Sequence, residues 1–498
     1  MIELNGQPLT LDQMEAVAQG RESVSLGLPA KQRMEASRMV VDGIVEKDEV
    51  VYGINTGFGK LSDVRVPHCD IERLQLNLVR SHSSGIGKPL SVPESRAIMV
   101  LRANVLAMGF SGCRPLIVEF LIEMLNLGVV PVIPERGSVG ASGDLATLAH
   151  LALAMIGEGE VWEGETHLPA AAALAAHGLP PIKLGAKEGL ALLNGTQAMA
   201  ATGGLAIRCA LRLAHVADVA GAMTLEALRG TPVAFDERIH LARPHRGQAE
   251  SARNLRDLMI DSEIRRSHLL NDPRVQDAYS LRCMPQVHGA VRDALRHVQE
   301  IVEVETASAT DNPLVFTDTN EVLSGGNFHG APLALGFDYA AIAMTDLTSI
   351  SERRIDRLVN PDLNEGLPPF LTTHAGMESG FMIPHVAAVS LLNESKVLSH
   401  PASVDNVPTS GGKEDHVSMG MTSALKLRRV VENTATVFAI ELLAAAQGLD
   451  FREPLKPGKG VMKAYEKVRS LSKPLTEDRP LYKDIARVAQ AVQEGEFE

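Results

Sequence analysis

The chain has 498 residues, of which 45% are hydrophobic and 22% are charged, as in ordinary soluble globular proteins. This length exceeds what one compact core usually holds, so we expect more than one domain. The formal net charge of −13 argues against nucleic-acid partners and against binding to an anionic membrane surface, because both require an excess of Lys and Arg.

The N-terminal part, residues 1–185, combines glycine-rich turns with short β-branched runs such as residues 129–133. This texture predicts a smaller domain of mixed α/β character. The first residues lack the basic and apolar regions of a signal peptide, and no apolar stretch is both long enough and free enough of charge to cross a bilayer. We therefore expect a cytoplasmic protein that does not insert into a membrane.

Four cysteines are scattered singly along the chain, without the short spacings that zinc and redox sites require. They are Cys69, Cys113, Cys209 and Cys283. We expect buried thiols and no metal site.

The tripeptide Ala141-Ser142-Gly143 lies in a glycine-rich stretch just before a predicted helix over residues 145–156. Because Gly143 has no Cβ, its amide nitrogen can swing back onto the Ala141 carbonyl through dihedrals that other residues resist. Loss of water from that ring and from Ser142 would leave an electron-poor methylidene-imidazolone, which ordinary side chains cannot supply. The simpler interpretation is a turn that caps the following helix.

Residues 186–449 are predicted to form a bundle of long helices, because Ala, Leu, Val and Met dominate the apolar segments and aromatic residues make up only 4% of the chain. One helical stripe consists of Val291, Leu295, Val298 and Val302. Comparable long segments occupy about residues 188–228, 332–358, 384–400 and 414–449. Residues 450–498 are predicted to be a helical tail, so the fold as a whole is expected to be mainly α.

Short motifs follow one another in a fixed order between about residues 50 and 420. They are residues 52–59, Ser81-His82, 140–146, 194–196, 276–282, 310–314, 325–330 and 414–419. With this ordered set the chain resembles the aromatic amino acid ammonia-lyase family. The resemblance implies a long-helix bundle of the fumarase/aspartase-like type, with a smaller N-terminal domain that carries the Ala-Ser-Gly loop. It also implies a homotetramer whose active sites combine residues of neighbouring subunits.

The resemblance further implies that Ala141-Ser142-Gly143 forms 4-methylidene-imidazol-5-one (MIO) autocatalytically, so that no external cofactor is needed. Catalytic roles would then fall to Tyr52 as general base, to Tyr279 and to Glu414. The implied binding residues are His82, Asn194, Gln276, Arg282 and Phe328. Asn194 would hydrogen-bond the imidazolone carbonyl, Arg282 would grip the substrate carboxylate, and Phe328 would pack beside the ring.

Each of these residues also has an ordinary structural interpretation. Asn194 precedes a glycine and suits a turn, Tyr52 and Phe328 suit a core, Arg282 suits a solvated surface, and Glu414 suits a helix N-terminus. The sequence does not decide whether Tyr52 or Glu414 is the principal base.

Substrate choice is expected to depend on the pair Ser81-His82 together with Glu414. At the positions of Ser81-His82, family members that act on phenylalanine or tyrosine usually carry Phe-Leu or His-Leu, whereas those that act on histidine carry Ser-His. Burying an imidazole nitrogen without a partner costs roughly 1 to 3 kcal/mol, and His82 and Glu414 can supply the partners. The resemblance thus implies that L-histidine is converted to urocanate and ammonia. Alternatives are a tyrosine or phenylalanine lyase, an aminomutase, or a helical scaffold without activity.

Two residues depart from the family pattern. Thr147 stands where relatives commonly have proline, and Gly412-Lys413 replaces a frequent Asn-Gln pair before Glu414. The positive charge of Lys413 is expected to depress the pKa of Glu414 or to draw this carboxylate away from the substrate.

Overall fold

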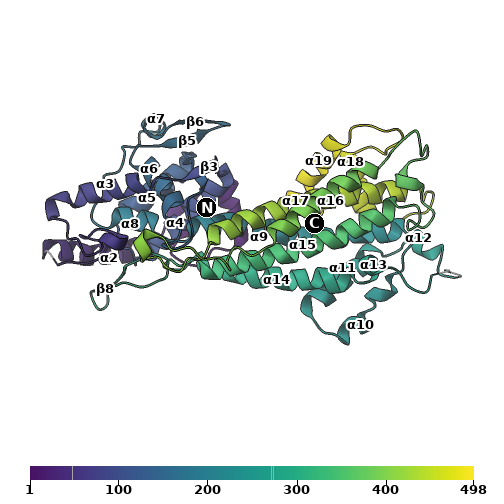
Figure 1. Ribbon diagram of the computed structural model, residues 1–498, viewed down its shortest axis with the longest axis horizontal. Coiled ribbons are helices and arrows are strands. Elements are labelled where there is room, and N and C mark those ends of the chain that lie inside the picture. The colour runs from purple at the N-terminus through teal and green to yellow at the C-terminus, as the bar shows by residue number, and fades with distance from the viewer. Residues whose placement is uncertain (48, 271, 273) are drawn as a thin grey trace. The chain divides into compact units, whose positions relative to one another are not determined.

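The computed structural model describes residues 1–47, 49–270, 272 and 274–498 (Figure 1). The chain forms two compact units, each assembled from separate stretches. Unit 1 comprises Met1–Arg208, Val298–Asp338 and Pro401–Leu425, and unit 2 comprises Cys209–His297, Tyr339–His400 and Lys426–Glu498. The division in chain order at residues 1–185, 186–449 and 450–498 stays a prediction.

Long helices connect the stretches, each beginning in one unit and ending in the other. They are α9 (Gln197–Ala227), α14 (Met284–Glu305), α15 (Ala331–Val359) and α17 (Gly420–Asp450). The predicted stripe of α14 is buried, since Val291, Leu295, Val298 and Val302 are at most 2% exposed. The 3.6-residue period therefore identified a face that packs in a core.

Unit 1 contains shorter helices. They are α1 (Leu11–Ala18), α2 (Leu28–Glu46), α3 (Ile71–His82), α4 (Val92–Ala107), α5 (Pro115–Leu127), α6 (Leu145–Met155), α7 (Ala170–Ala176) and α8 (Glu188–Leu193), with 3₁₀ turns η1 (Gly59–Leu61), η2 (His68–Asp70) and η5 (Ser410–Gly412). Local signals set several ends: α4 starts at a capping box of Ser91 and Glu94, and α5 stops at Gly128, whose φ is +76°. Helix α4 is buried along nearly its whole length and forms the centre of this unit's core.

The strands of unit 1 pair in twos. Strand β1 (Ile2–Leu4) runs parallel to β2 (Val24–Leu26), whereas the antiparallel pairs are β3 (Ile86–Pro89) with β4 (Pro134–Arg136), β5 (Glu160–Glu163) with β6 (Thr166–Pro169), and β7 (Leu314–Phe316) with β8 (Glu321–Leu323). The β-branched run 129–133 is not a strand of its own, but the Val132 amide donates to the Glu160 carbonyl and ties the run to β5. The pair β3 and β4 leads directly into the Ala-Ser-Gly loop.

Unit 2 consists of helices with short turns between them. Besides its parts of the long helices it contains η3 (Pro232–Phe235), α10 (Glu237–Leu241), α11 (Arg246–Leu258), α12 (Glu263–Arg266), α13 (Tyr279–Arg282), η4 (Pro369–Leu371), α16 (Met382–Leu398), α18 (Lys459–Leu471) and α19 (Tyr482–Gln493). A fully buried ion pair joins Arg354 to Glu441 at 2.5 Å, and Thr224 and Ser351 donate hydrogen bonds to the same carboxylate. These bonds satisfy charges that burial would otherwise make costly.

The mainly helical architecture predicted from the sequence is confirmed, with two differences in helix boundaries. The segment 188–228 is not continuous, because the chain leaves α8 at Asn194 and re-enters a helix at Gln197. The segment 414–449 becomes helical only at Gly420. Both interruptions are places where the chain makes polar contacts with the Ala-Ser-Gly loop. None of the described helices combines the length and apolar character that a bilayer crossing needs.

The expectation of four buried thiols is wrong for Cys69, which is exposed in η2. Cys113 is buried, and burial raises the pKa of its thiol to about 12, whereas Cys209 and Cys283 are partly buried. Scattered spacing argues against metal or redox pairs, but it carries no information about the exposure of each side chain.

Candidate active site

The Ala-Ser-Gly loop lies between β4 and α6 in unit 1 and is held by its own hydrogen bonds. The Ser138 hydroxyl is 3.1 Å from the Gly143 carbonyl oxygen and 2.9 Å from Asp144 Oδ1, and it accepts a bond from the Gly140 amide at 3.1 Å. Ala141 and Gly143 are buried, and Ser142 is half-buried. The loop is therefore a folded structural element with the central serine turned toward polar partners.

Gly143 is constrained by the turn that follows α8. Its φ of +70° lies in the left-handed region, and a Cβ there would stand 2.2 Å from the Gly195 carbonyl oxygen. The two glycines form a parallel bridge, and the Asp144 amide donates to the same Gly195 carbonyl at 2.7 Å. Only glycine fits this position, because both the left-handed φ and the nearby Gly195 carbonyl oxygen disfavour a Cβ.

Asp144 anchors the end of the loop and is fully buried. Its Oδ2 accepts a hydrogen bond from the Met199 amide at 2.8 Å, so the carboxylate caps the N-terminal turn of α9. Burial raises the pKa of Asp144 to about 6, although the hydrogen bonds that it accepts oppose this shift. The residue thus connects the loop to the start of a long helix.

Asn194 ends α8 and faces the same loop. Its Nδ2 donates to the Ser142 backbone carbonyl at 3.1 Å, and the side chain is 4% exposed. The Asn194 Oδ1 is buried and has no hydrogen-bond partner in the part of the chain that the structure describes. A buried polar atom without a partner is costly.

Glu414 contacts the serine of the loop directly. The Ser142 hydroxyl donates to Glu414 Oε1 at 2.6 Å, and the Thr409 hydroxyl donates to Oε2 at 2.5 Å. Burial by itself raises the pKa of Glu414, but hydrogen bonds from Ser142, Thr409 and Ser410 outweigh it and hold the pKa below its usual value. The carboxyl group is therefore ionised near neutral pH.

The residues after Glu414 support the back of the loop. The Ser418 hydroxyl donates to the Gly140 carbonyl at 3.1 Å, and the Met419 amide donates to the Val139 carbonyl at 2.8 Å. These contacts explain why residues 414–419 are not helical. Sequence reasoning did not predict Ser418, Ser138 or Thr409, because an isolated hydroxyl residue carries no spacing signal.

His82 is the last residue of α3 and is half-buried. Its Nδ1 lies 2.9 Å from the Leu78 carbonyl oxygen, which only accepts, so the proton is on Nδ1 and Nε2 is left as an acceptor. Burial lowers the pKa of His82, against the opposing effects of the Leu78 carbonyl and the charge of Glu414. A neutral imidazole and an ionised carboxylate thus face the same region.

Tyr52 lies in the turn that precedes η1, edge to face with Phe58 at a centroid distance of 6.4 Å. Burial raises the pKa of its phenol, the charges of Glu414 and Asp311 raise it further, and a backbone hydrogen bond with Gly59 opposes them. The phenol is protonated at neutral pH. Because the charge of Glu414 raises the pKa of Tyr52, the two side chains are close enough to interact electrostatically.

Phe328 is half-buried in the turn after β8. Its neighbour His329 stacks on His416 with ring centroids 5.8 Å apart and nearly parallel, and His329 Nε2 lies 3.1 Å from the His416 carbonyl oxygen. The turn that carries Phe328 is therefore fastened to the segment that carries Glu414.

Gln276, Tyr279 and Arg282 belong to unit 2 and are not among the residues that unit 1 gathers around Ser142. Gln276 is exposed in a loop, whereas Tyr279 and Arg282 are the two ends of α13. The Arg282 guanidinium stacks 4.6 Å above the Tyr279 ring, and Tyr279 is 71% exposed. The Arg282 Nε is buried without a hydrogen-bond partner in the described chain.

The two departures from the family pattern have different structural consequences. Thr147 is fully buried in the first turn of α6, where proline is tolerated, and its hydroxyl donates to the Asp144 carbonyl at 2.9 Å. Lys413 is exposed beside Glu414, whose carboxylate stays on Ser142 and Thr409. The lysine therefore does not draw Glu414 away from the loop.

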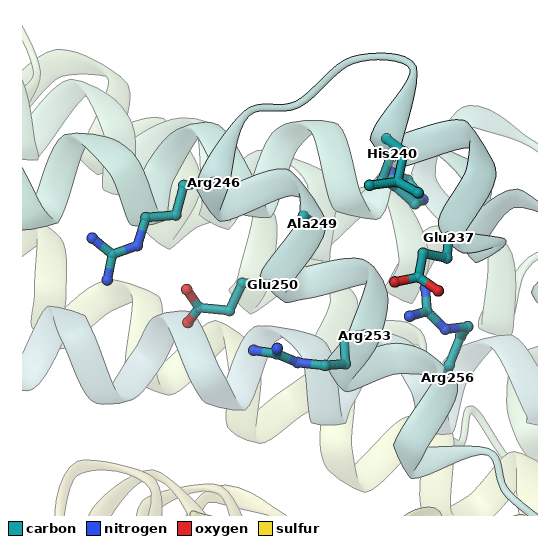
Figure 2. Close-up of a pocket in the computed structure, with 8 residues that line it drawn as sticks. Glu237, His240, Arg246, Ala249, Glu250, Arg253 and Arg256 are labelled. Atoms are coloured by element: carbon teal, nitrogen blue, oxygen red, sulfur yellow. The ribbon is translucent and has the colours of Figure 1, made fainter.

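A cavity of about 400 Å³ in unit 2 is lined by charged side chains of α10 and α11 (Figure 2). Arg246, Arg253 and Arg256 line it together with Glu237 and Glu250, and Glu250 is already paired with Arg292 at 3.0 Å and Arg296 at 2.8 Å. It contains no residue predicted from the sequence to act in catalysis. The candidate site is therefore the Ser142 loop, which is defined by its contacts and not by the volume of a cavity.

Comparisons with known proteins identify the family of the chain. The family model described as aromatic amino acid lyase matches residues 9–470. Histidine ammonia-lyases from Anaeromyxobacter dehalogenans (strain 2CP-C) and Myxococcus xanthus (strain DK1622) are both 54% identical to the chain. The first alignment covers 99% of each sequence, and the second covers 100% of this chain and 97% of the relative.

Solved structures have the same fold. A histidine ammonia-lyase from Trypanosoma cruzi is 44% identical, with a TM-score of 0.92, over 100% of this chain and 94% of its own. A tyrosine aminomutase from Streptomyces globisporus is 40% identical, with a TM-score of 0.95, over 100% and 97%. With a family match over most of its length and relatives this similar, the chain belongs to the aromatic amino acid lyase family.

Proposed function

We propose that the chain catalyses the non-oxidative deamination of L-histidine to trans-urocanate and ammonia, using an MIO electrophile made from Ala141-Ser142-Gly143. The observation that carries the proposal is the hydrogen bond from Asn194 to the carbonyl of Ser142, in a loop that Gly143 closes against Gly195. The full-length similarity to histidine ammonia-lyases supports the choice of substrate.

The residues around the loop fit the proposed group. Gly143 has a left-handed φ of +70° and no room for a Cβ, and the Asn194 amide donates to the carbonyl that would become part of the ring. When formed, the group supplies an electrophile that captures the substrate and makes nitrogen a better leaving group. Asn194 holds its carbonyl and withdraws electron density from it.

His82 and Glu414 are proposed to bind the imidazole of the substrate. His82 Nε2 accepts a hydrogen bond, because Nδ1 is committed to the Leu78 carbonyl, and Glu414 is an ionised acceptor. A protonated imidazole ring donates from both of its nitrogens and so satisfies both acceptors, whereas the phenyl ring of phenylalanine leaves them unpaired. Leaving buried polar groups without partners is how such sites reject apolar analogues.

Tyr52 is proposed to take the proton from the β-carbon of the substrate. Burial keeps its phenol protonated in the isolated chain, so the reactive phenolate requires added positive charge or further hydrogen bonds. Glu414 is proposed to assist proton transfer from the other side of the site.

Gln276, Tyr279 and Arg282 are proposed to complete the site of a neighbouring copy in a homotetramer. The Tyr279 ring, which is 71% exposed, supports an arrangement in which another chain covers it. Arg282 would bind the substrate carboxylate through two parallel hydrogen bonds, and Tyr279 would donate to the reacting groups. Hybrid oligomers of Ser142→Ala and Arg282→Ala chains test this arrangement. Recovered activity in the hybrids supports shared sites, whereas a lack of activity contradicts them.

The alternative is a tyrosine or phenylalanine lyase or an aminomutase, since a tyrosine aminomutase shares the fold with a TM-score of 0.95. Product analysis on L-histidine, L-tyrosine and L-phenylalanine separates these activities. We expect urocanate and ammonia from L-histidine, and loss of this preference in His82→Leu. A β-amino acid product would favour the aminomutase. The cytoplasmic location stays a prediction, to be checked by cell fractionation.

A further inference from the structure

Ser142 and Glu414 are separated by 272 residues, yet the serine hydroxyl donates to Glu414 Oε1 at 2.6 Å. This hydroxyl is the group that has to leave when the Ala-Ser-Gly loop matures. The second carboxylate oxygen is held by Thr409 at 2.5 Å, so the carboxylate is fixed toward the serine. The contact places a proton-transfer group directly at the bond that must break.

We propose that Glu414 catalyses the loss of water from Ser142 during maturation, a role that precedes and is separate from turnover of substrate. The inference rests on the proposed function, because it concerns the formation of the same group. The Glu414 carboxylate would then act first in maturation and later in the reaction with substrate.

Loss of water from Ser142 can proceed as a proton relay in which atoms and charge balance. The Glu414 carboxylate removes the Cα proton of Ser142, and that electron pair forms the Cα–Cβ double bond while the Cβ–Oγ bond breaks. The carboxylic acid just formed then gives its proton to the departing hydroxide, which leaves as water. Glu414 is an ionised carboxylate again at the end, so no oxidant, reductant or further reactant is consumed.

The charge state and position of Glu414 suit this task. Hydrogen bonds hold its pKa below the usual value, so the group starts as the base that the first half of the relay requires. His82 faces the same region, but its Nδ1 is committed to Leu78, and the Tyr52 phenol is protonated. Neither of these groups starts with a negative charge at the serine.

Asp144 is the other acidic residue at the loop, and its carboxylate positions the loop through hydrogen bonds. Its two oxygens accept hydrogen bonds from the Ser138 hydroxyl at 2.9 Å and the Met199 amide at 2.8 Å. The side chain is fully buried beneath the loop. The proton relay is therefore assigned to Glu414, and the positioning of the loop to Asp144.

Maturation also changes what Glu414 can bind. While Ser142 keeps its hydroxyl, Oε1 is occupied by this donor. Once the water has left, Oε1 has lost the Ser142 donor and can accept a polar hydrogen of the substrate, whereas Oε2 remains on Thr409. Formation of the electrophile and opening of the substrate site are thus one event.

The test follows maturation by intact mass, independently of activity. Parent, Glu414→Gln and Glu414→Ala chains are made in a cell-free system, quenched at intervals and weighed, and circular dichroism checks that each folds. Asp415→Asn is the matched control, because this neighbouring acid is exposed. We expect the parent and the control to lose two waters, and Glu414→Gln to lose the serine water roughly 100-fold more slowly.

Chemical rescue distinguishes acid-base catalysis from a structural effect. Sodium formate is expected to restore loss of the serine water in Glu414→Ala, whereas sodium chloride at equal concentration does not. Loss of both waters at the parent rate in either Glu414 variant would overturn the inference and leave the proposed function intact. A parent chain that loses no water would instead overturn the proposed function.

Discussion

The side-chain amide of Asn194 donates a hydrogen bond to the backbone carbonyl of Ser142 at 3.1 Å, from the end of one helix to a loop 52 residues earlier. The donor is buried, and among the residues that the structure describes its own Oδ1 has no hydrogen-bond partner. Preorganised donors of this kind act most strongly on charge that develops during a reaction.

We predict that Asn194→Ala lowers kcat for L-histidine by roughly 100- to 1000-fold, because it removes one such donor. Intact mass would show whether the variant still matures, and steady-state kinetics would give kcat. Asn360→Ala is a suitable control, since the Asn360 side chain accepts a local bond from the Asp362 amide. Equal kcat values for Asn194→Ala and the parent would remove Asn194 from the site.

Gly143→Ala is predicted to abolish maturation. The added Cβ would meet the Gly195 carbonyl oxygen at 2.2 Å, and the backbone φ of +70° is unfavourable for alanine. Gly43→Ala provides the contrast, because Gly43 lies inside α2 and no atom of the described residues is within 4 Å of the position its Cβ would take. There we expect a gain of about 0.5 to 1 kcal/mol in unfolding free energy. Intact mass and thermal unfolding measure the two effects, and a fully matured Gly143→Ala chain would contradict this description of the loop.

Asp144 is predicted to make stability depend on pH. Its pKa is raised from 3.8 to about 6 in the folded chain. Below pH 3.8 both states hold the proton and the group contributes nothing, and between 3.8 and 6 only the unfolded chain releases it, so stability falls as pH rises. Above pH 6 the penalty is constant at about 3 kcal/mol.

Asp144→Asn removes this ionisation while keeping an acceptor for the Met199 amide. We therefore expect the difference in Tm between variant and parent to shift in favour of the variant as the pH rises from 4 to 7. Thermal unfolding followed by circular dichroism at several pH values checks this. A difference in Tm that does not change with pH would mean that Asp144 has an ordinary pKa.

Arg282→Ala is predicted to raise KM for L-histidine at least tenfold, which corresponds to about 1.4 kcal/mol, with a smaller effect on kcat. The physical reason is the loss of a two-bond grip on the substrate carboxylate. Tyr52→Phe is the matched comparison, since loss of the phenolic oxygen should lower kcat and leave KM nearly unchanged. Unchanged kinetics in both variants would exclude the site assignment, and a reversed pattern would exchange the two roles.

Much of the helical framework follows from the sequence, because apolar spacing reports directly on which helix face is buried. The stripe Val291, Leu295, Val298 and Val302 is an example, and all four residues lie in a core. The helix breaks at residues 194–196 and 414–419 were not predicted as breaks. They depend on contacts with the Ser142 loop, which is distant along the chain, and local propensity contains no such information.

The candidate site was predicted only in part, for the same reason. Ordered motifs indicated Ser142, Asn194 and Glu414, and in the structure the Asn194 side chain bonds to the Ser142 backbone carbonyl while the Ser142 hydroxyl bonds to Glu414. Thr409, which fixes the Glu414 carboxylate, belongs to no motif and was found only through geometry. The exposure of Cys69 likewise could not be predicted from the sequence, since a single cysteine carries no periodic signal.

Intact mass of the purified chain beside its Ser142→Ala variant, with ammonia and urocanate release from L-histidine followed in the same samples, tests whether the loop forms the electrophile that the reaction uses. We predict that the parent alone is lighter than its sequence by two waters, and that it alone releases both products. A parent of unmodified mass that nevertheless released urocanate would show that the reaction proceeds without the group that the loop is proposed to form.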